Sequence, residues 1–324
     1  MEAYLGIDIG SVSTKFAVLD QSDELITHLY LQTQGKPIEV VQQGLRQIKQ
    51  QLPEDADICG VATTGSARYL AGVIVGADVV KNEITSHAVA TLHYTPQVQT
   101  VFEIGGQDSK IIIIRDEIVT DFGMNTVCAA GTGSFLDHQA LRLNMTIEEL
   151  SRRAMASDSP VRIAGRCTVF AESDMVHKQQ VGHRIEDILY GLCQALVRNY
   201  INNIGLGKDI QPPIMFQGGV AFNQAIVKAF QEELNTDIIV PPHHEIMGAI
   251  GSALLVHEEM VRNKSGSKFK GFGVSEVTYR TSSFECKTCP NLCEIAQLSL
   301  EGQSLVRWGG RCDLWEREPA IQKL

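Results

Sequence analysis

One pattern, which occurs twice, constrains this chain more than any other feature of its sequence. Residues 8–15 read D-I-G-S-V-S-T-K after an apolar run, and residues 103–110 read E-I-G-G-Q-D-S-K after a second one, 95 positions later. Each apolar run ends at a glycine turn and is followed by further strand-forming residues, which predicts a β-hairpin. An offset this long is not that of a solenoid repeat. It indicates two domains of like fold that face each other, with the ligand site in the cleft between them.

The remaining periodicity predicts an α/β fold. Apolar residues at helical spacing and short apolar runs alternate along both halves. The predicted helices are 37–52, 66–75, 83–94, 131–142, 146–156, 169–181, 184–206, 222–234 and 245–260, and further strands are predicted at I-C-G-V-A-T-T-G, I-M-F-Q-G-G and D-I-I-V-P-P. We expect lobe I at residues 1–95, completed by the helix near 245–260, and lobe II at residues 96–244. A polar linker begins at residue 263 and leads to a cysteine-rich tail that ends at residue 324.

Composition excludes several classes of protein. The chain has 324 residues, with 28 Lys and Arg against 38 Asp and Glu, a net charge of -10. Such a balance gives no electrostatic footprint for nucleic acid or anionic lipid, so any polyanion must be held locally by backbone amides or a metal. We find no apolar run of the roughly 18 to 20 residues that a membrane span needs, and no signal-peptide pattern at the start. The expected location is the cytoplasm.

Three glycine turns form the candidate nucleotide site. A strand that ends in such a turn presents backbone N–H groups, and neighbouring hydroxyls can bind phosphate oxygens without positive charge. For any single turn, a glycine needed only for a tight connection is the alternative; the three together favour a nucleotide. Asp8 would hold Mg²⁺ through water, and Gln107 and Asp108 would face the same phosphates from the opposite wall. The predicted phosphate and nucleoside contacts are Gly10, Ser11, Ser13, Thr14, Lys15, Gly105, Gly106, Gly218 and Gly219.

Two of the eight cysteines stand directly before predicted helix starts. Cys128 precedes A-A-G-T-G-S-F-L-D, and Cys167 precedes T-V-F-A-E-S-D-M. Thiolates there gain from the positive end of the helix dipole, and so does an anionic iron-sulfur cluster. A [4Fe-4S] cluster normally takes four cysteines, which two copies of the chain would supply across a twofold axis. The alternative is a pair of buried core thiols, which we expect for Cys59 and Cys193.

The sequence resembles the sugar kinase, heat-shock protein 70 and actin superfamily of ATPases at its three glycine turns. More narrowly, E-I-G-G-Q-D-S-K, N-T-V-C-A-A-G-T-G-S-F-L-D, G-R-C-T-V-F-A-E-S-D-M and P-P-H-H-E-I-M-G-A-I-G-S-A-L-L are similar to segments of the activators of 2-hydroxyacyl-CoA dehydratases and the ATPase subunits of benzoyl-CoA reductases. The resemblance extends from about residue 3 to residue 258. Glu103 stands where several family members carry Asp.

The resemblance implies a fold and a mechanism. The fold is two ribonuclease-H-like, actin-like lobes around a cleft that binds ATP or ADP with Mg²⁺. For ATP hydrolysis, Gln107 and Asp108 are by position the candidates for orienting the hydrolytic water. The redox centre is one [4Fe-4S] cluster held by Cys128 and Cys167 of each subunit of a homodimer. A ferredoxin or flavodoxin would supply the electron. The acceptor would be an iron-sulfur enzyme such as a 2-hydroxyacyl-CoA dehydratase, a benzoyl-CoA reductase-like enzyme or a related double-cluster protein.

The tail carries its own cysteine cluster. Cys286, Cys289, Cys293 and Cys312 lie within 27 residues, around a stretch, L-S-L-E-G-Q-S-L-V-R-W, that predicts a hairpin. Cysteines at this spacing can ligate Zn²⁺ or a second iron-sulfur cluster, and the sequence leaves both open.

Two other functions remain compatible with the sequence. A kinase of the same superfamily that phosphorylates a small metabolite would make Cys128 and Cys167 incidental. A scaffold protein that uses nucleotide only as a switch would bind ATP without redox activity. Both predict a protein without iron at these two cysteines.

Overall fold

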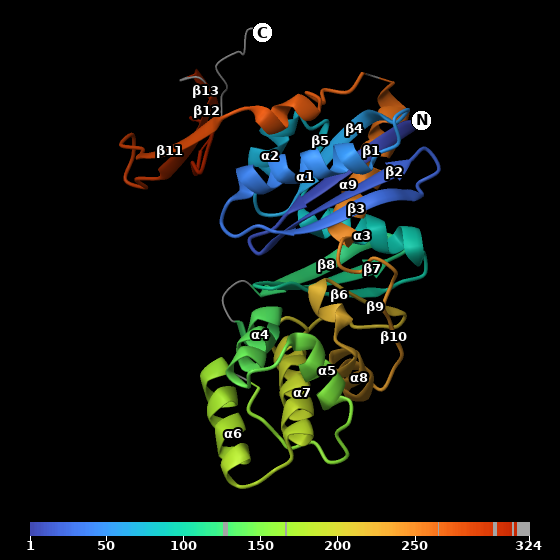
Figure 1. Ribbon diagram of the computed structural model, residues 1–324, viewed down its shortest axis with the longest axis vertical. Helices are drawn as coiled ribbons and strands as arrows, with labels where there is room; N and C mark the ends of the chain where they lie inside the picture. The colour runs from blue at the N-terminus through green and yellow to red at the C-terminus, as the bar shows by residue number, and fades with distance from the viewer. Residues whose placement is uncertain (126–128, 166, 265, 301–302, 313, 316–324) are drawn as a thin grey trace. The chain divides into compact units, whose positions relative to one another are not determined.

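The structure is a computed structural model and describes residues 1–125, 129–165, 167–264, 266–300, 303–312 and 314–315 (Figure 1). The chain forms two compact units. The first contains Met1–Lys81 and Leu255–Leu324, and the second contains Asn82–Leu254. Helix α9 (Met247–Asn263) contributes residues to both. The domain boundaries predicted at residues 95 and 263 stay predictions.

The first unit is built on a five-stranded sheet with the strand order β3-β2-β1-β4-β5. Its strands are β1 (Glu2–Ile9), β2 (Ser13–Asp20), β3 (Leu25–Gln32), β4 (Asp57–Thr64) and β5 (Val79–Val80), and its first helices are α1 (Pro37–Gln51) and α2 (Arg68–Val75). Strand β1 lies in the middle of the sheet, and seven of its eight residues are buried. It pairs antiparallel with β2 and parallel with β4. Helix α1 starts with a proline, which suits the first turn, and buries Val41, Leu45 and Ile48.

The second unit repeats this topology. Its sheet order, β10-β9-β6-β7-β8, places β6 between an antiparallel and a parallel neighbour, as β1 is placed in the first unit. Its strands are β6 (Thr100–Ile104), β7 (Ser109–Arg115), β8 (Ile118–Asn125), β9 (Ile214–Gln217) and β10 (Ile238–Ile239). The duplication predicted from the two hairpins is therefore present in the strand order as well.

Long helices supply most of the core of the second unit. They are α3 (Glu83–Tyr94), α4 (Gly133–Arg142), α5 (Ile147–Ala154), α6 (Thr168–Gln180), α7 (Ile185–Asn203) and α8 (Gln224–Leu234), with short 3₁₀ turns η1 (Ala129–Gly131) and η2 (Gly219–Phe222). The ring of Tyr200 on α7 packs edge-on against Phe102 of β6 and Phe230 of α8, at 5.2 and 5.4 Å between centroids. Such aromatic contacts fix α7 and α8 against the sheet.

The C-terminal region forms a third, smaller sheet in the order β11-β12-β13. These antiparallel strands are β11 (Tyr279–Glu285), β12 (Glu294–Leu300) and β13 (Gln303–Trp308), preceded by the turn η3 (Phe272–Glu276). Residues before the sheet are attached to the first unit. Gln42 of α1 donates to the carbonyls of Val274 and Val277, at 3.1 and 2.7 Å, and Asp78 accepts from the backbone N–H of Lys268 at 2.6 Å.

The structure confirms the predicted α/β class, with two five-stranded sheets and a small C-terminal sheet. The sequence pattern did not predict β11. Every residue of β11 after Tyr279 is exposed, so the strand lacks the alternation of apolar and polar residues that marks a half-buried strand. In the described part of the chain, no helix is long and apolar enough to cross a membrane.

Candidate functional site

The first glycine turn connects β1 to β2 and is closed by its own backbone. The N–H of Gly10 donates to the carbonyl of Ser13 at 2.9 Å. The hydroxyl of Thr33 donates to the carbonyl of Gly10 at 2.9 Å and lies 2.9 Å from the hydroxyl of the buried Thr14. Ser11 is exposed at the tip of the turn. The turn therefore has a fixed shape, with Ser11 at its accessible edge and Thr14 inside the packing.

A buried ion pair lies at the base of this turn. Asp8 and Lys15 are directly opposite in the β1–β2 ladder, and Lys15 Nζ lies 3.1 Å from Asp8 Oδ2. Thr64, at the end of β4, is opposite Asp8 on the other side, and its buried hydroxyl has no hydrogen-bond partner among the described residues. Gly65 follows with φ +87°, and a Cβ there would lie 2.6 Å from Asp8 Oδ1. Thr64 and Gly65 thus border the carboxylate that was predicted to hold Mg²⁺.

The second glycine turn repeats this construction. The N–H of Gly105 donates to the carbonyl of Asp108 at 3.0 Å. Lys110 lies opposite Glu103 in the ladder, and its Nζ is 2.9 Å from Glu103 Oε2 and 3.0 Å from Asp108 Oδ2. Burial would lower the pKa of Lys110, but the two carboxylates outweigh burial and raise that pKa above its ordinary value. Gln107 is exposed at the tip.

The third glycine turn is the counterpart of Gly65 in the second unit. Gly218 follows β9, the parallel neighbour of β6, with φ +92°. A Cβ there would lie 2.4 Å from the carbonyl oxygen of Ile104 and 2.9 Å from Glu103 Oε1. Only glycine fits both the backbone angle and the space. Sequence reasoning identified Gly218 but missed Gly65, although each ends an apolar strand.

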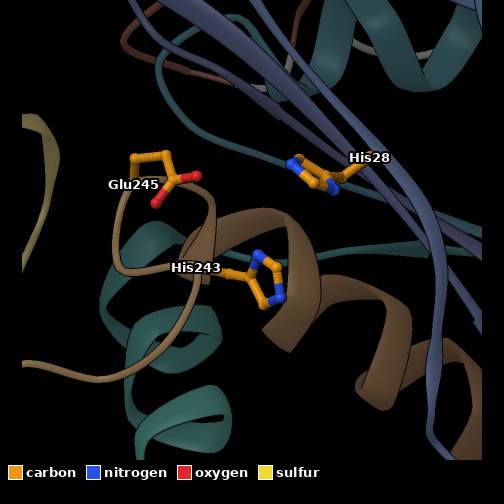
Figure 2. Close-up of side chains that lie close together, drawn as sticks. All are labelled: His28, His243 and Glu245. Atoms are coloured by element: carbon orange, nitrogen blue, oxygen red, sulfur yellow. The ribbon is translucent and has the colours of Figure 1, made fainter.

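His244, in the loop before α9, supports the third turn. The N–H of Gly218 donates to the carbonyl of His244 at 2.8 Å, and His244 Nδ1 lies 3.0 Å from the carbonyl oxygen of Gly218. Figure 2 shows His243 and Glu245 on this loop of the second unit, and His28 on β3 of the first. His244 also packs edge-on against the ring of Phe222 at 4.2 Å. These contacts give His244 a structural role at the glycine turn.

Cys167 is the residue that caps the start of α6. Its carbonyl accepts the N–H of Ala171 at 2.9 Å, and no side chain caps this helix end. The thiol is half-buried and forms no disulfide. Val169 and Phe170, in the first turn of α6, are each 66% exposed. Cys128 lies outside the described residues.

Asn199 of α7 lies against the segment that precedes Cys167 and the segment that follows Cys128. It is 3% exposed, and its amide N–H donates to the carbonyl of Gly165, two residues before Cys167. Its Oδ1 would lie 3.0 Å from a Cβ at Gly131, three residues after Cys128. Asn203, one turn further along the helix, donates to the same Oδ1 at 2.9 Å. No local pattern pointed to Asn199, because the carbonyl of Gly165 to which it donates lies 34 residues away along the chain.

The second glycine turn is attached to the start of α4. The N–H of Gly133 donates to the carbonyl of Gly105 at 2.9 Å, and the N–H of Ser134 donates to the carbonyl of Gly106 at 2.9 Å. The hydroxyl of Ser134 also donates to the carbonyl of Gly106. Three hydrogen bonds therefore connect the predicted phosphate turn to the helix that follows the Cys128 segment.

Helices α4 and α6 are joined to each other by one ion pair. Arg142 at the end of α4 pairs with Glu172 of α6. Both groups are substantially exposed, so the pair contributes little stability in water. It does join the two helices that start beside the cysteine segments.

Cys193 and Cys59, the remaining cysteines before the C-terminal tail, differ in burial. Cys193 on α7 is fully buried, as expected for a core thiol, and burial raises its pKa to about 12. Cys59 in β4 is half-buried, and burial raises its pKa as well. Neither thiol is suited to act as a nucleophile at neutral pH, because the thiolate is the reactive form.

Both units thus carry a carboxylate and a lysine at the base of a glycine turn, and this duplicated arrangement defines an actin-like ATPase fold. Residues 5–256 match the BadF/BadG/BcrA/BcrD ATPase family, and the chain belongs to that family. The 2-hydroxyisocaproyl-CoA dehydratase activator of Clostridioides difficile is 33% identical over 79% of this chain and 95% of the relative.

Two solved structures show the same fold. The crystal structure of component A of the (R)-2-hydroxyglutaryl-CoA dehydratase of Acidaminococcus fermentans has a TM-score of 0.74 at 30% identity, and the match covers 81% of this chain and 100% of that one. The activator of the 2-hydroxyisocaproyl-CoA dehydratase from Clostridium difficile, with bound ADPNP, has a TM-score of 0.72 at 31% identity, over 81% and 97%. The resemblance expected from the four sequence segments is confirmed.

Proposed function

We propose that this protein is an ATP-dependent reductive activator. It hydrolyses ATP and passes one electron to a partner iron-sulfur enzyme of the 2-hydroxyacyl-CoA dehydratase or benzoyl-CoA reductase type, after receiving that electron from a ferredoxin or flavodoxin. The names of its relatives support an activator of such an enzyme, and the ADPNP bound to one of them supports nucleotide binding.

The glycine turns of both units would bind the nucleotide. Ser11 is accessible, and Gly106 lies in a turn that the hydrogen bond from the Gly105 N–H to the Asp108 carbonyl closes. Asp8 would hold Mg²⁺ through water, and the Thr64 hydroxyl beside it, which has no hydrogen-bond partner among the described residues, would be a further oxygen ligand for the hydrated ion. Exposed Gln107 suits the role of orienting water better than Asp108, since the carboxylate of Asp108 is paired with Lys110.

Cys128 and Cys167 of two copies would hold one [4Fe-4S] cluster. Cys167 fits this role because the start of α6 lacks a side-chain cap, so its N–H groups and helix dipole favour an anionic group beside the thiolate. Exposed Val169 and Phe170 next to Cys167 are apolar surface that a second copy would cover. When bound, the cluster supplies a one-electron carrier whose potential depends on its hydrogen bonds and exposure.

The attachment of the second glycine turn to α4 is the observation that carries this proposal. A nucleotide that moves Gly105 and Gly106 must also move the start of α4 or break up to three hydrogen bonds. Each such bond contributes about 0.5–1.5 kcal/mol, so the connection is strong enough to transmit a small displacement. The helix would then change the surroundings of the Cys128 segment when nucleotide binds.

Anaerobic purification with iron and sulfide analysis, mass measurement and EPR of the reduced protein tests the proposal. We expect a dimer with one cluster per two chains, lost in Cys128→Ser and Cys167→Ser and kept in Cys59→Ser. A monomer without iron at these positions would contradict the proposal. If such a protein consumed ATP only with a small-molecule acceptor, a metabolite kinase would be the better description.

A further inference from the structure

The end of the small C-terminal sheet gathers three cysteines. Strand β11 ends at Glu285 and β12 begins at Glu294, and these two residues are paired. Cys286 and Cys293 come next on each strand, and the N–H of Cys286 donates to the carbonyl of Cys293 at 2.8 Å. The ladder therefore continues to this pair, which puts both side chains on one face of the sheet. Cys289 lies on the exposed turn between them.

The fourth cysteine approaches the same end of the sheet from β13. Gly309 follows this strand with φ +100°, and a Cβ there would lie 2.6 Å from the carbonyl oxygen of Glu294. Gly310 is close to the backbone of Cys312, since its Cβ would lie 2.9 Å from the carbonyl oxygen of that residue. Gly309 and Gly310 therefore turn the chain beside Glu294, the residue that follows Cys293. All four cysteines thus belong to one end of a three-stranded sheet, and all four are free thiols.

The sulfur of Cys286 has the surroundings of a thiolate. Cys286 is 6% exposed, and its Sγ lies 3.2 Å from Trp315 Nε1 and 3.4 Å from Thr288 Oγ1. An indole N–H can only donate, so Trp315 points a donor at the sulfur. Donors of this kind orient metal-bound thiolates and stabilise their charge.

The small sheet has little apolar core of its own. Ile295 and Leu298 are its fully buried apolar residues in the described part of the tail, and Leu298 packs in the hydrophobic cluster of the first unit rather than within the sheet. Strand β11 is exposed along almost its whole length. Small β structures with so little buried apolar surface usually depend on a disulfide or a bound metal. The thiols here are not joined to each other, which favours the metal.

We propose that Cys286, Cys289, Cys293 and Cys312 bind one Zn²⁺ as four thiolates and that this ion stabilises the C-terminal sheet. Four S–H protons are released and four Zn–S bonds form, with no change of oxidation state. A tetrahedral all-thiolate set is typical of structural zinc and excludes Mg²⁺ and Ca²⁺, which need oxygen ligands.

In the residues searched, no three of these sulfurs lie within 4.8 Å of one another. Binding therefore requires the Cys289 turn and Cys312 to close on Cys286 and Cys293. Closure is the change that the metal would drive, since Zn–S bonds are about 2.3 Å long. The site uses none of the residues of the proposed ATPase function, so each proposal can fail without the other.

Metal analysis of the full chain, followed by titration with Co²⁺ in place of Zn²⁺, tests this site. We expect about one zinc per chain, kept in Cys167→Ser and Cys59→Ser. In Cys289→Ser we expect the affinity for Zn²⁺ to fall at least about tenfold, the lower range for loss of a supporting ligand interaction. The Co²⁺ form should show the charge-transfer absorption of thiolate ligands.

Two results would overturn the proposal. One is the absence of both bound zinc and a thiolate-to-cobalt band after the metals are supplied to the unmodified chain. The other is iron with sulfide that is lost on Cys289→Ser and kept on Cys167→Ser, which would assign a second iron-sulfur cluster to the tail. Because the cobalt titration uses the unmodified chain, the result stands even if Cys289→Ser fails to fold.

Discussion

Replacement of Gly218 by alanine tests the geometry at the end of β9. Gly218 has φ +92° and ψ 174°, a region that is essentially restricted to glycine and costs other residues about 1–3 kcal/mol. The added Cβ would lie 2.4 Å from the carbonyl oxygen of Ile104, and relief of this overlap costs about 1–3 kcal/mol more. We expect Gly218→Ala to lower the free energy of unfolding by about 2–6 kcal/mol in urea denaturation.

The same substitution should weaken nucleotide binding. The Cβ would also lie 2.9 Å from Glu103 Oε1, so the carboxylate that holds Lys110 must move. Titration calorimetry with ADP measures this effect. Gly65→Ala, at the counterpart position, should behave alike, since its Cβ would lie 2.5 Å from the carbonyl oxygen of Ile9.

Gly273→Ala is the matched control, because a Cβ at Gly273 meets nothing within 4 Å. Its free energy of unfolding should stay within about 0.5 kcal/mol of the unsubstituted protein. If Gly218→Ala were as stable as Gly273→Ala, the positive φ and the close approach to Ile104 would both be wrong, and the reasoning on this turn would be refuted.

Three further predictions concern the second unit. Ser134→Ala removes one hydrogen bond worth about 1 kcal/mol. The factor by which ATP changes the rate of iron removal by a chelator should therefore fall roughly fivefold. Asn199→Ala should lower the free energy of unfolding by about 1–3 kcal/mol and reduce the iron content, since it leaves a buried carbonyl unpaired. Cys193 should resist iodoacetamide in the native protein at pH 8, because its thiol pKa is raised to about 12. The unfolded chain releases this proton from about pH 9, so Cys193 should lower stability between pH 9 and 12 by up to about 1.4 kcal/mol per pH unit. Cys193→Ala should make the fall shallower, while the part due to the buried tyrosines Tyr190 and Tyr200 remains.

The first two predictions have matched comparisons on helices of the second unit. Ser173→Ala removes a hydroxyl that bonds only within α6 and should leave the ATP effect on iron release unchanged. Asn202→Ala changes an exposed residue of α7 and should leave both stability and iron content unchanged. A Ser134→Ala protein that responds to ATP like Ser173→Ala would show that the hydroxyl does not transmit the change. Equal iron content in Asn199→Ala and Asn202→Ala would exclude a positioning role for Asn199.

The sequence was sufficient to predict features that depend on neighbours along the chain. Asp8 and Lys15 are seven positions apart on either side of a glycine turn, so a hairpin puts them opposite each other, and the structure does so. Thr64 and Gly65 could not be assigned to the same site, because they reach Asp8 only through the parallel pairing of β1 with β4. Pairing between distant strands leaves no local trace in the residues themselves.

The tail shows the same limit in another form. The hairpin of β12 and β13 was predicted from its alternating residues, but β11 has no buried face to produce such a pattern. Its pairing depends on the neighbouring strand rather than on its own side chains. The spacing of the four tail cysteines was visible in the sequence, whereas the Trp315 N–H that donates to the Cys286 sulfur reaches it only through the fold.

The two acid–lysine pairs, although alike in register, differ in their access to water. The side chain of Lys15 is 18% exposed, whereas that of Lys110 is 5% exposed and is shared by two carboxylates. Solvent therefore reaches the Lys15–Asp8 pair more readily than the Lys110–Glu103 pair. If Asp8 holds the hydrated cation as we propose, Lys15 would give way to it, whereas Lys110 would stay paired with Glu103. On this proposal, duplication of one hairpin has given the first unit an exchangeable ion pair and the second unit a lasting one.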